Sequence, residues 1–526
     1  MRIRRFLLCV SVVLLLAHCG FAQDNVRLTV TVTGSDGAPV RDLKKADFSL
    51  QDAGKPRTID TFVSPLTPLA APQLEANEYS NAPIAGEAGA IFVVLDTIHT
   101  RYIDERDMRE LILKFLGNAA QAKRAVALAI LSAKGLRVYH DYQTSSNVLL
   151  AGLIKAGLGG MKGGTPPAGV SDAEVNAEAA RLTAFSKGDL ANPTPPEQLV
   201  RSSVDMPLIM FQDVGHAAYG LPGYKALVWV TNITPFDIDP KTFQFMSNKE
   251  VNQGVAVAGA QTGGTKDALS NDEIKRILPI WRRSMRSLSE GGVAVYPVEA
   301  RGSSSAGANT YTNNTMKLLG QLTGGKGFYG SNDPFPEILQ ISNGNLAGYA
   351  LGFAGDANPS SGFHRVQVTA NKPGSVLNAP LGYFPLEGTL KSRAQDDVSL
   401  GLQSPLAFTG LPFSVQFTGN EDNAGKKKVN MAISLRGDSG VLNEATRTVD
   451  LAVIAVAKDA KDATVGKLNE NSGGQFPPEA VAQIKELGFQ LSRSIEVPTG
   501  DFTLHFVIRD NQTGRMGSLI VPLKVP

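Results

Sequence analysis

The feature that most constrains the fold is an alternation of apolar strands and amphipathic helices between residues 91 and 354. The predicted strands are IFVVLD (91–96), AVALAILS (125–132), LRVYHDY (136–142), KALVWVT (225–231), VAVYPVEA (293–300) and GKGFYG (325–330). A strand in which nearly every residue is apolar is covered on both faces of its sheet. Strands that alternate with helices along the chain usually pair in parallel. We therefore predict a mostly parallel sheet between two helical layers, with a longer insertion at 157–222.

The flanking segments have the two-residue period of β structure. Residues 25–64 and 349–384 contain a few short strands each, too few for either to bury a stable core, so we expect them to pair into one flanking β domain. About seven short strands after residue 398 indicate an antiparallel β-sandwich. The predicted organisation is an N-terminal β unit (25–64), a linker (65–89), the α/β domain (90–348), further strands (349–384), a polar linker (385–397) and a C-terminal sandwich (398–526).

The first 22 residues have the three parts of a secretory signal: arginines, an apolar stretch, and small residues before a cleavage site after Ala22. An uncleaved anchor is the alternative, but a membrane span needs about 20 apolar residues and this run is shorter. A lipoprotein signal would use Cys19, yet His18 stands where a small residue belongs. We expect a secreted or periplasmic protein with no transmembrane segment after cleavage.

Charge and cysteine content narrow the possible partners and chemistry. The whole chain has a formal net charge of +2, and the signal removes three arginines and no acid, so the mature chain is close to neutral. Bulk charge therefore gives no indication of nucleic-acid binding. Both cysteines, Cys9 and Cys19, lie within the signal, so we expect no disulfide and no thiolate ligand. An exported chain of this size without disulfides is more typical of bacteria than of animals.

Polar residues follow two of the predicted strands at the edge where ligands bind in wound sheets. Asp96 and Thr100 come directly after the first strand, and Asn232 follows KALVWVT. Because the carboxyl ends of parallel strands meet at one edge, we expect these side chains to be close together and accessible to other molecules.

An ordered set of motifs gives this chain a resemblance to a known family. The motifs are GAPVRDLKKADFSLQDAGKPRTIDTF, VVLDTIHT, GYKALVWVT, VAVYPVEARG, LTGGKGFYGSND and LGYFP. In this order they resemble the von Willebrand factor A-related proteins of acidobacteria, over residues 26 to about 384. The resemblance implies an α/β doubly wound, Rossmann-like von Willebrand factor A-type domain plus flanking antiparallel β-sandwich domains. It also implies protein–protein interaction or adhesion through the loops at the carboxyl edge of the sheet, and we expect these to be the loop around Asp96, the insertion at 157–222 and the loop at 232–270.

Many domains of that wider family hold Mg²⁺ with an Asp-x-Ser-x-Ser loop, a threonine and a later aspartate. The positions that match here are Asp96, Thr100, Asn232 and either Thr144 or Thr165. Ile98 replaces the first serine and cannot bind a metal, and Asn232 replaces a charged ligand. A site with one carboxylate is expected to bind Mg²⁺ weakly. The metal site is therefore degenerate, and the alternative is that Asp96 caps the following segment or accepts backbone hydrogen bonds in the loop.

The sequence leaves three functions open. We expect a non-enzymatic binding protein with a protein partner of unknown identity. The alternatives are an envelope hydrolase that uses the same edge, and a purely structural envelope component. The sequence shows no nucleophile with a partnering base. His99 and His140 are expected to be polar loop or surface residues, and RGDSG (436–440) is expected to form a hairpin turn.

Overall fold

The computed structural model describes residues 25–526, with the exception of 66–73, 76, 84–88, 101, 189–195, 247–270, 301–309, 332–337, 340, 342–346, 357–361 and 424. The predicted signal segment and both cysteines lie outside the described residues, as does most of the loop at 232–270. None of the described helices is long and apolar enough to cross a bilayer.

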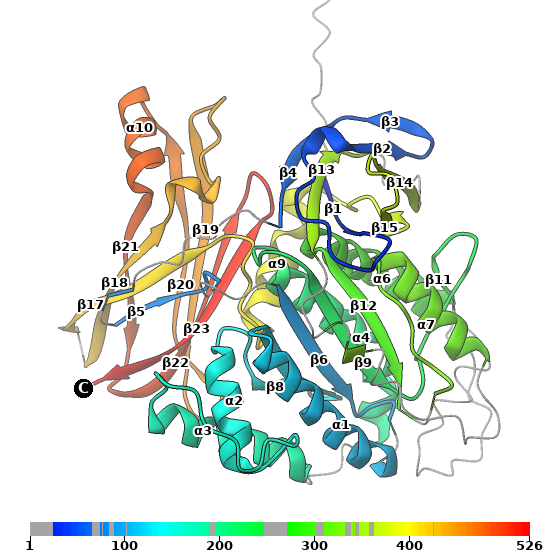
Figure 1. Cartoon of the computed structure of the whole chain (residues 1–526). Helices are drawn as coiled ribbons and strands as arrows, with labels where there is room; N and C mark the ends of the chain where they lie inside the picture. The colour runs from blue at the N-terminus through cyan, green and yellow to red at the C-terminus, as the bar shows by residue number, and fades with distance from the viewer. Residues whose placement is uncertain are drawn as a thin grey trace, which may run out of the picture.

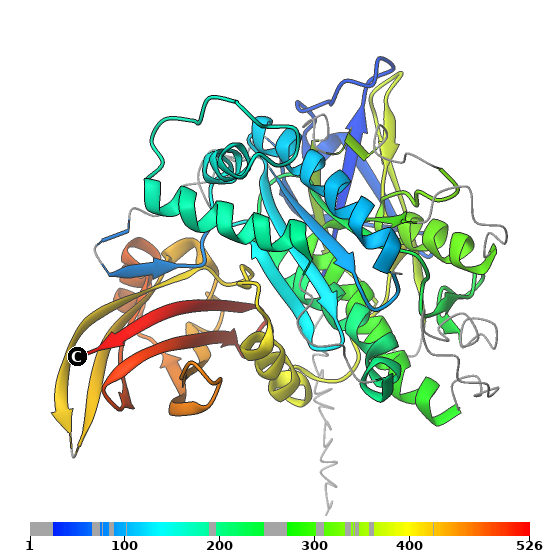
Figure 2. The same cartoon turned by 90° about the horizontal axis from the view of Figure 1, so that it is seen from below.

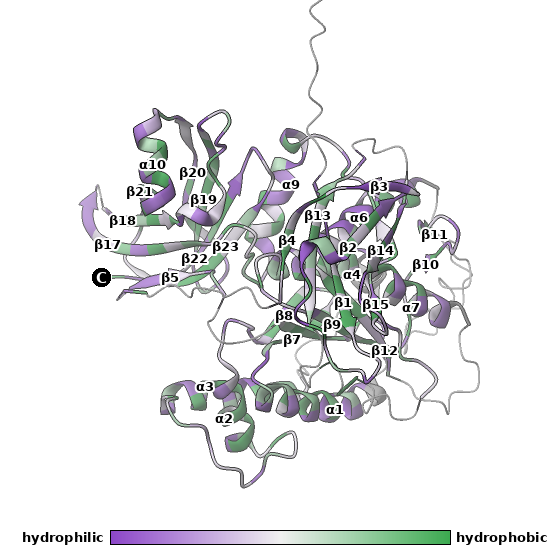
Figure 3. Cartoon of the chain, turned by 45° about the horizontal axis from the view of Figure 1, so that its top comes forward, coloured by the Kyte–Doolittle hydropathy of each residue, from purple (hydrophilic) through white to green (hydrophobic). Residues whose placement is uncertain are grey.

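A five-stranded sheet forms the centre of the molecule, in the order β12-β9-β6-β7-β8. Its strands are β6 (Ala90–Asp96), β7 (Ala125–Ser132), β8 (Gly135–His140), β9 (Lys225–Thr231) and β12 (Val293–Glu299). β12, β9, β6 and β7 are parallel to one another, whereas β8 is antiparallel to β7. Every residue of β6, β9 and β12 is buried, and the strands of this sheet are mostly hydrophobic in Figure 3.

Helices cover both faces of this sheet (Figure 1). The helices of one face are α1 (Tyr102–Gln121), α2 (Ser146–Ala156) and α3 (Asp172–Lys187), and those of the other face are α4 (Pro196–Ala218), α6 (Asn271–Gly291) and α7 (Thr310–Thr323). Alternate residues of β6 enter different cores: Val93 packs with the first group and Val94 with the second. The predicted insertion at 157–222 contains α3 and α4.

The N-terminal strands and the strands after residue 348 form two further four-stranded sheets, β15-β1-β13-β4 and β16-β14-β2-β3. Their strands are β1 (Asn25–Thr33), β2 (Phe48–Asp52), β3 (Lys55–Arg57), β4 (Ile59–Val63), β13 (Gly348–Ala354), β14 (His364–Ala370), β15 (Val376–Asn378) and β16 (Gly382–Tyr383). β1 pairs along its length with β13, so that Leu28 is opposite Leu351. Tyr349 of β13 is fully buried in the core of this unit, and its hydroxyl donates to the Val40 carbonyl.

The C-terminal part is a sandwich of two antiparallel sheets, β21-β18-β17-β5 and β20-β19-β22-β23. The strands are β5 (Glu78–Ser80), β17 (Phe413–Asn423), β18 (Lys426–Leu435), β19 (Thr448–Lys458), β20 (Thr464–Gln475), β21 (Phe489–Val497), β22 (Gly500–Asp510) and β23 (Met516–Val525). β5 comes from the segment expected to be a linker (65–89). The next residue, Asn81, is fully buried and holds this strand by hydrogen bonds to Phe408, Leu411 and Phe413.

A helix, α9 (Leu390–Gln403), connects the central unit to the sandwich, as Figure 2 shows from below. The prediction of a polar linker at 385–397, with the sandwich beginning at 398, was wrong, because residues 390–403 are helical. Thr389 caps the helix, because its hydroxyl accepts from the Ser392 amide while the Ser392 hydroxyl accepts from the Thr389 amide. RGDSG likewise contains a short 3₁₀ helix, Gly437–Ser439, and α10 (Pro478–Leu487) follows β20.

The expected fold class, a doubly wound von Willebrand factor A-type domain with flanking sandwiches, is wrong for this chain. Within the described residues, parallel pairing between strands is confined to four strands of one sheet, and the other strand pairs are antiparallel. The pattern of continuous apolar runs led to the error, because it singles out the few strands that are covered on both faces. The predicted strand at 325–330 is only an isolated bridge between Phe328 and Val298.

Candidate functional site

The strongest candidate site lies at the carboxyl edge of the central sheet. In the strand register, Leu95 is opposite Val230, and Thr231 is opposite Glu299, so Asp96, Thr231 and Glu299 end their strands at one level. α1 and α7 follow β6 and β12, so the first turn of each helix also belongs to this edge. We call this group of strand ends and first turns the carboxyl edge.

Asp96 is sealed inside this edge. Its exposed fraction is 0%, and both of its carboxylate oxygens accept hydrogen bonds from the chain itself. Oδ1 accepts from the amides of Ile98 (3.0 Å) and His99 (3.2 Å). Oδ2 accepts from His99 Nδ1 (2.7 Å) and Trp229 Nε1 (3.2 Å). The expectation that other molecules reach Asp96 was therefore wrong, because the loop after β6 folds back over the carboxylate.

The residues proposed as metal ligands do not all come together. Thr100 and Asn232 are buried at the carboxyl edge with Asp96. Thr144 follows β8, and because β8 is antiparallel to β7, Thr144 lies toward the opposite edge of the sheet. Thr165 is exposed in the loop between α2 and α3.

The donor set does not fit a magnesium ion. Mg²⁺ requires oxygen ligands with open lone pairs, whereas four donors already occupy the Asp96 carboxylate. In the described part of the chain, no three His, Cys, Asp or Glu side chains are arranged to hold a metal ion. We therefore derive no chemistry from a metal at this edge.

His99 and Trp229 are the site residues that the sequence did not predict. His99 was expected to be a polar loop residue, but its side chain is 2% exposed and forms a buried pair with Asp96. The Asp-x-x-His spacing directly after a buried strand was the available signal. Because a carboxylate only accepts hydrogen bonds, the paired Nδ1 carries the proton and Nε2 is left to act as an acceptor in the neutral ring. Nε2 is buried, and in the part of the chain that the structure describes it has no hydrogen-bond partner.

Further buried polar atoms of the carboxyl edge also have no hydrogen-bond partner among the described residues. They are the hydroxyls of Thr100 and Thr234 and the side-chain carbonyl oxygen of Asn313. Thr234 follows β9 and is fully buried, and Asn313 is in the first turn of α7. A buried polar atom without a partner costs about 1–3 kcal/mol, so such atoms are rare unless water or a ligand completes them.

Other acids near this edge are satisfied from within the chain. Asp237 Oδ1 accepts from Thr315 Oγ1 at 2.6 Å, and Glu299 Oε2 accepts from the Gly330 amide at 2.9 Å. Burial raises the pKa of the Glu105 carboxyl, while its hydrogen bond with Arg109 opposes the shift and the negative charge of Asp96 adds to it. The negative charge of Asp96 therefore disfavours ionisation of Glu105.

Two more histidine–carboxylate pairs are buried elsewhere. His140, expected at the surface, is 1% exposed, and its Nδ1 lies 2.8 Å from Glu178 Oε1. His364 Nδ1 lies 2.9 Å from Asp52 Oδ1, and the Tyr383 hydroxyl donates to the other oxygen of Asp52. Such pairs are therefore a repeated structural device in this chain, and only the Asp96–His99 pair lies at the carboxyl edge.

Comparisons with known proteins give little beyond this geometry. No protein-family model and no curated protein matches the chain. A glycosyl hydrolase family 2 member from Bacteroides cellulosilyticus DSM 14838 is similar over 35% of this chain and 20% of its own, with 10% identity and a TM-score of 0.16. A β-glucuronidase from glycoside hydrolase family 2 is similar over 35% of this chain and 18% of its own, with 10% identity and a TM-score of 0.15. The chain thus spans about a fifth of the length of these structures.

Proposed function

We propose that this is an exported, non-catalytic binding protein that recognises a partner protein through the carboxyl edge of its central sheet. The supporting observation is the concentration of unpartnered, buried polar atoms there: His99 Nε2, the Thr100 and Thr234 hydroxyls, and Asn313 Oδ1. They come from the ends of β6 and β9 and from the start of α7, three separate elements that converge on one edge. These atoms are covered in the free protein, so the loops after β6 and β9 must first move aside before a polar side chain of a partner supplies the missing hydrogen bonds.

In this proposal, Asp96 positions His99 and makes no contact with the partner. Its four hydrogen bonds hold the loop after β6 and fix the ring of His99 with Nε2 directed away from the carboxylate. Recognition then requires no metal ion, which distinguishes it from adhesion through a bound cation.

The test is a cross-linking pull-down from the native host with purified protein as bait. We expect the wild type to retain one defined partner, and the double variant Thr100→Val/Thr234→Val to lose it. The matched control is Thr165→Val, which makes the same change at an exposed threonine away from the edge and should retain the partner. A chelator should leave the interaction unchanged. Equal capture by the double variant and the wild type would contradict the proposal.

The Asp96–His99 pair favours a hydrolase as the second candidate function. A carboxylate that orients a histidine, with the other ring nitrogen open, is the arrangement of a general base. A threonine hydroxyl of the edge would have to serve as the nucleophile, and neither Thr100 nor Thr234 is hydrogen-bonded to Nε2.

Hydrolysis of p-nitrophenyl esters and glycosides by the wild type, His99→Gln and Thr165→Val separates the two candidates. Turnover that His99→Gln abolishes and Thr165→Val preserves would establish the hydrolase and overturn the binding-protein proposal. We expect the same background rate for all three proteins.

A further inference from the structure

The joint between the central unit and the C-terminal sandwich is formed by α4, α9 and the segment 404–411. Thr409 is fully buried and binds the end of α4: its amide donates to the His216 carbonyl and its hydroxyl to the Ala217 carbonyl. The Gly220 amide donates to the same hydroxyl at 2.8 Å. A side chain at position 220 would place its Cβ 2.2 Å from the Thr409 carbonyl oxygen, so the two backbones approach as closely as glycine allows.

This joint contains a buried acid without a charged partner. Asp213 lies in α4, one turn before Ala217, and is 3% exposed. Its Oδ1 has no hydrogen-bond partner, and Ser404, which is also 3% exposed, hydrogen-bonds with its carboxyl group from the end of α9. Burial raises the pKa of Asp213 to about 7, against the opposing effect of the Ser404 hydrogen bond. A buried acid in such surroundings is held in its neutral form.

The other ionisable groups around the joint do not compensate an ionised Asp213. On α4, burial lowers the pKa of His216, although Asp397 and Glu290 raise it, so this ring stays neutral at pH 7. From α6, Glu290 is paired with Arg286. From α9, Asp397 is paired with Arg509, and Arg393 lowers the pKa of His216. On β22, burial lowers the pKa of His505.

We propose that Asp213 makes this joint pH-sensitive: the protonated carboxyl packs between α4 and α9, and loss of its proton to solvent weakens the contact between the two units. The neutral carboxyl is tolerated in the apolar contact, whereas the carboxylate would have to remain there without a cation. Opening of the joint exposes the group to water and restores its ordinary acidity.

The direction of the effect follows from proton linkage. The closed joint keeps the proton up to about pH 7, whereas the open joint releases it near the ordinary carboxyl pKa of 3.8. Between these values the closed form holds one more proton than the open form, so the closed-to-open ratio falls by up to about tenfold for each pH unit. Above the higher value both forms are ionised and the ratio becomes constant.

Hydrogen exchange of the intact chain, measured from pH 5 to 8 and corrected for the intrinsic exchange rate, tests this. The reporters are the amides of Thr409 and Gly220, whose hydrogen bonds to the His216 carbonyl and the Thr409 hydroxyl cross the joint. In the wild type, we expect protection of these amides to fall about tenfold per unit up to pH 7 and then to level off. Asp213→Asn imitates the neutral acid and should show constant protection. Amides within β19 and β22 report global unfolding and should not follow the same slope.

Two further variants sharpen the result. Asp205→Asn makes the same substitution on the same helix at a carboxylate already paired with Arg276, and it should keep the wild-type slope. Ser404→Ala removes the hydrogen bond that opposes the rise in the Asp213 pKa, so the levelling-off should move to higher pH. This shift remains measurable if Asp213→Asn does not fold. Flat protection in the wild type, an unchanged slope in Asp213→Asn, or an identical slope in β19 and β22 would overturn the proposal.

Discussion

The His99 Nδ1–H donates a hydrogen bond of 2.7 Å to Asp96 Oδ2. The two residues are three positions apart in the chain, and both side chains are buried. Trp229 donates its indole N–H to the same oxygen from the neighbouring strand. The buried carboxylate is thus surrounded by donors from its own loop and from β9. This makes Asp96 an organising residue of the carboxyl edge.

Asp96→Ala should lower the free energy of unfolding by about 3–5 kcal/mol, because it removes one member of a buried pair and leaves two amides and an indole without an acceptor. Asp107→Ala is the control, because this aspartate is exposed on α1; its loss should cost less than about 1 kcal/mol. Urea denaturation at pH 7 measures both. Millimolar Mg²⁺ should leave the free energy of unfolding of the wild type unchanged. If Mg²⁺ stabilises the wild type but not Asp96→Ala, the carboxylate is free to bind a metal ion and our interpretation of its four hydrogen bonds is wrong.

Thr234→Val should stabilise the free protein by about 1 kcal/mol, because valine has the same shape and removes a buried hydroxyl without a partner. Thr315→Val is the matched control. This threonine is also fully buried, but its hydroxyl donates to Asp237 at 2.6 Å, so its loss should destabilise by about 1–3 kcal/mol. Thermal unfolding of both variants is the measurement. A loss of stability in Thr234→Val would show that its hydroxyl is already satisfied.

Glu178 should contribute to acid denaturation. Burial would raise the pKa of this carboxyl, but hydrogen bonds from His140 and Arg181 outweigh it and hold the pKa below the usual 4.5. A depressed pKa stabilises the fold above 4.5, and the contribution is lost as the pH falls through the lower, folded-state value. The stability of the wild type should therefore fall more steeply below pH 4.5 than that of Glu178→Gln. Urea midpoints between pH 7 and 3.5 test this, and the exposed Glu479→Gln should follow the wild type.

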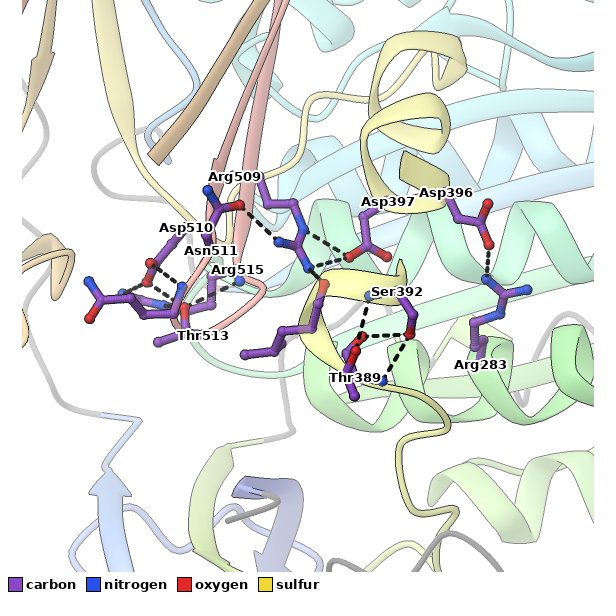
Figure 4. A network of polar contacts seen from close by, with 12 residues as sticks. Arg283, Thr389, Ser392, Asp396, Asp397, Arg509, Asp510, Asn511, Thr513 and Arg515 are labelled. Atoms are coloured by element: carbon purple, nitrogen blue, oxygen red, sulfur yellow. Dashed lines mark hydrogen bonds and ion pairs between the residues drawn. The ribbon is translucent and has the colours of Figure 1, made fainter. Parts of the chain in front are cut away.

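Two arginines hold α9 on its two sides, and they should contribute very differently (Figure 4). The side chain of Arg509 is 1% exposed and donates to Asp397, to the Leu390 carbonyl and to Asn511. Arg509→Met should cost about 3–5 kcal/mol, because it leaves these acceptors unpaired. Arg283 donates to Asp396, which is 65% exposed, and Arg283→Met should cost less than about 1 kcal/mol. If urea denaturation shows that the two variants lose equal amounts of unfolding free energy, α9 is not anchored mainly to the sandwich.

The sequence predicted individual strands well where burial is continuous. The expected strands at 125–132 and 225–231 coincide with β7 and β9, because uninterrupted apolar residues have few alternatives to a doubly covered strand. The direction of β8 was available in the sequence but was missed: only Ala133 and Lys134 separate β7 from β8, and a connection this short joins only antiparallel strands. That direction is the reason why Thr144 is far from Asp96.

Other errors arose from contacts between residues that are distant in the chain. α9 is polar along much of its length, and its cap pairs Thr389 with Ser392 in place of the usual glutamate, so the segment resembled a linker. β5 has only three residues and is recognisable only by its pairing with β17. The sealed state of Asp96 depends on Trp229, whose indole arrives from another strand. The position of a carboxylate along its strand is readable from the sequence, but the groups that cover it are not.

The pairing of β1 with β13, and of β5 with β17, has a consequence for biogenesis. Leu28 pairs with Leu351, so β1 can form its sheet only after residue 351 has been synthesised. Ser80 pairs with Ser414, so β5 likewise has to wait for the synthesis of β17. The two outer units therefore cannot be completed one after the other as the polypeptide emerges. A nascent chain of this kind stays open for most of its synthesis and acquires its outer layers late, by closing loops of several hundred residues.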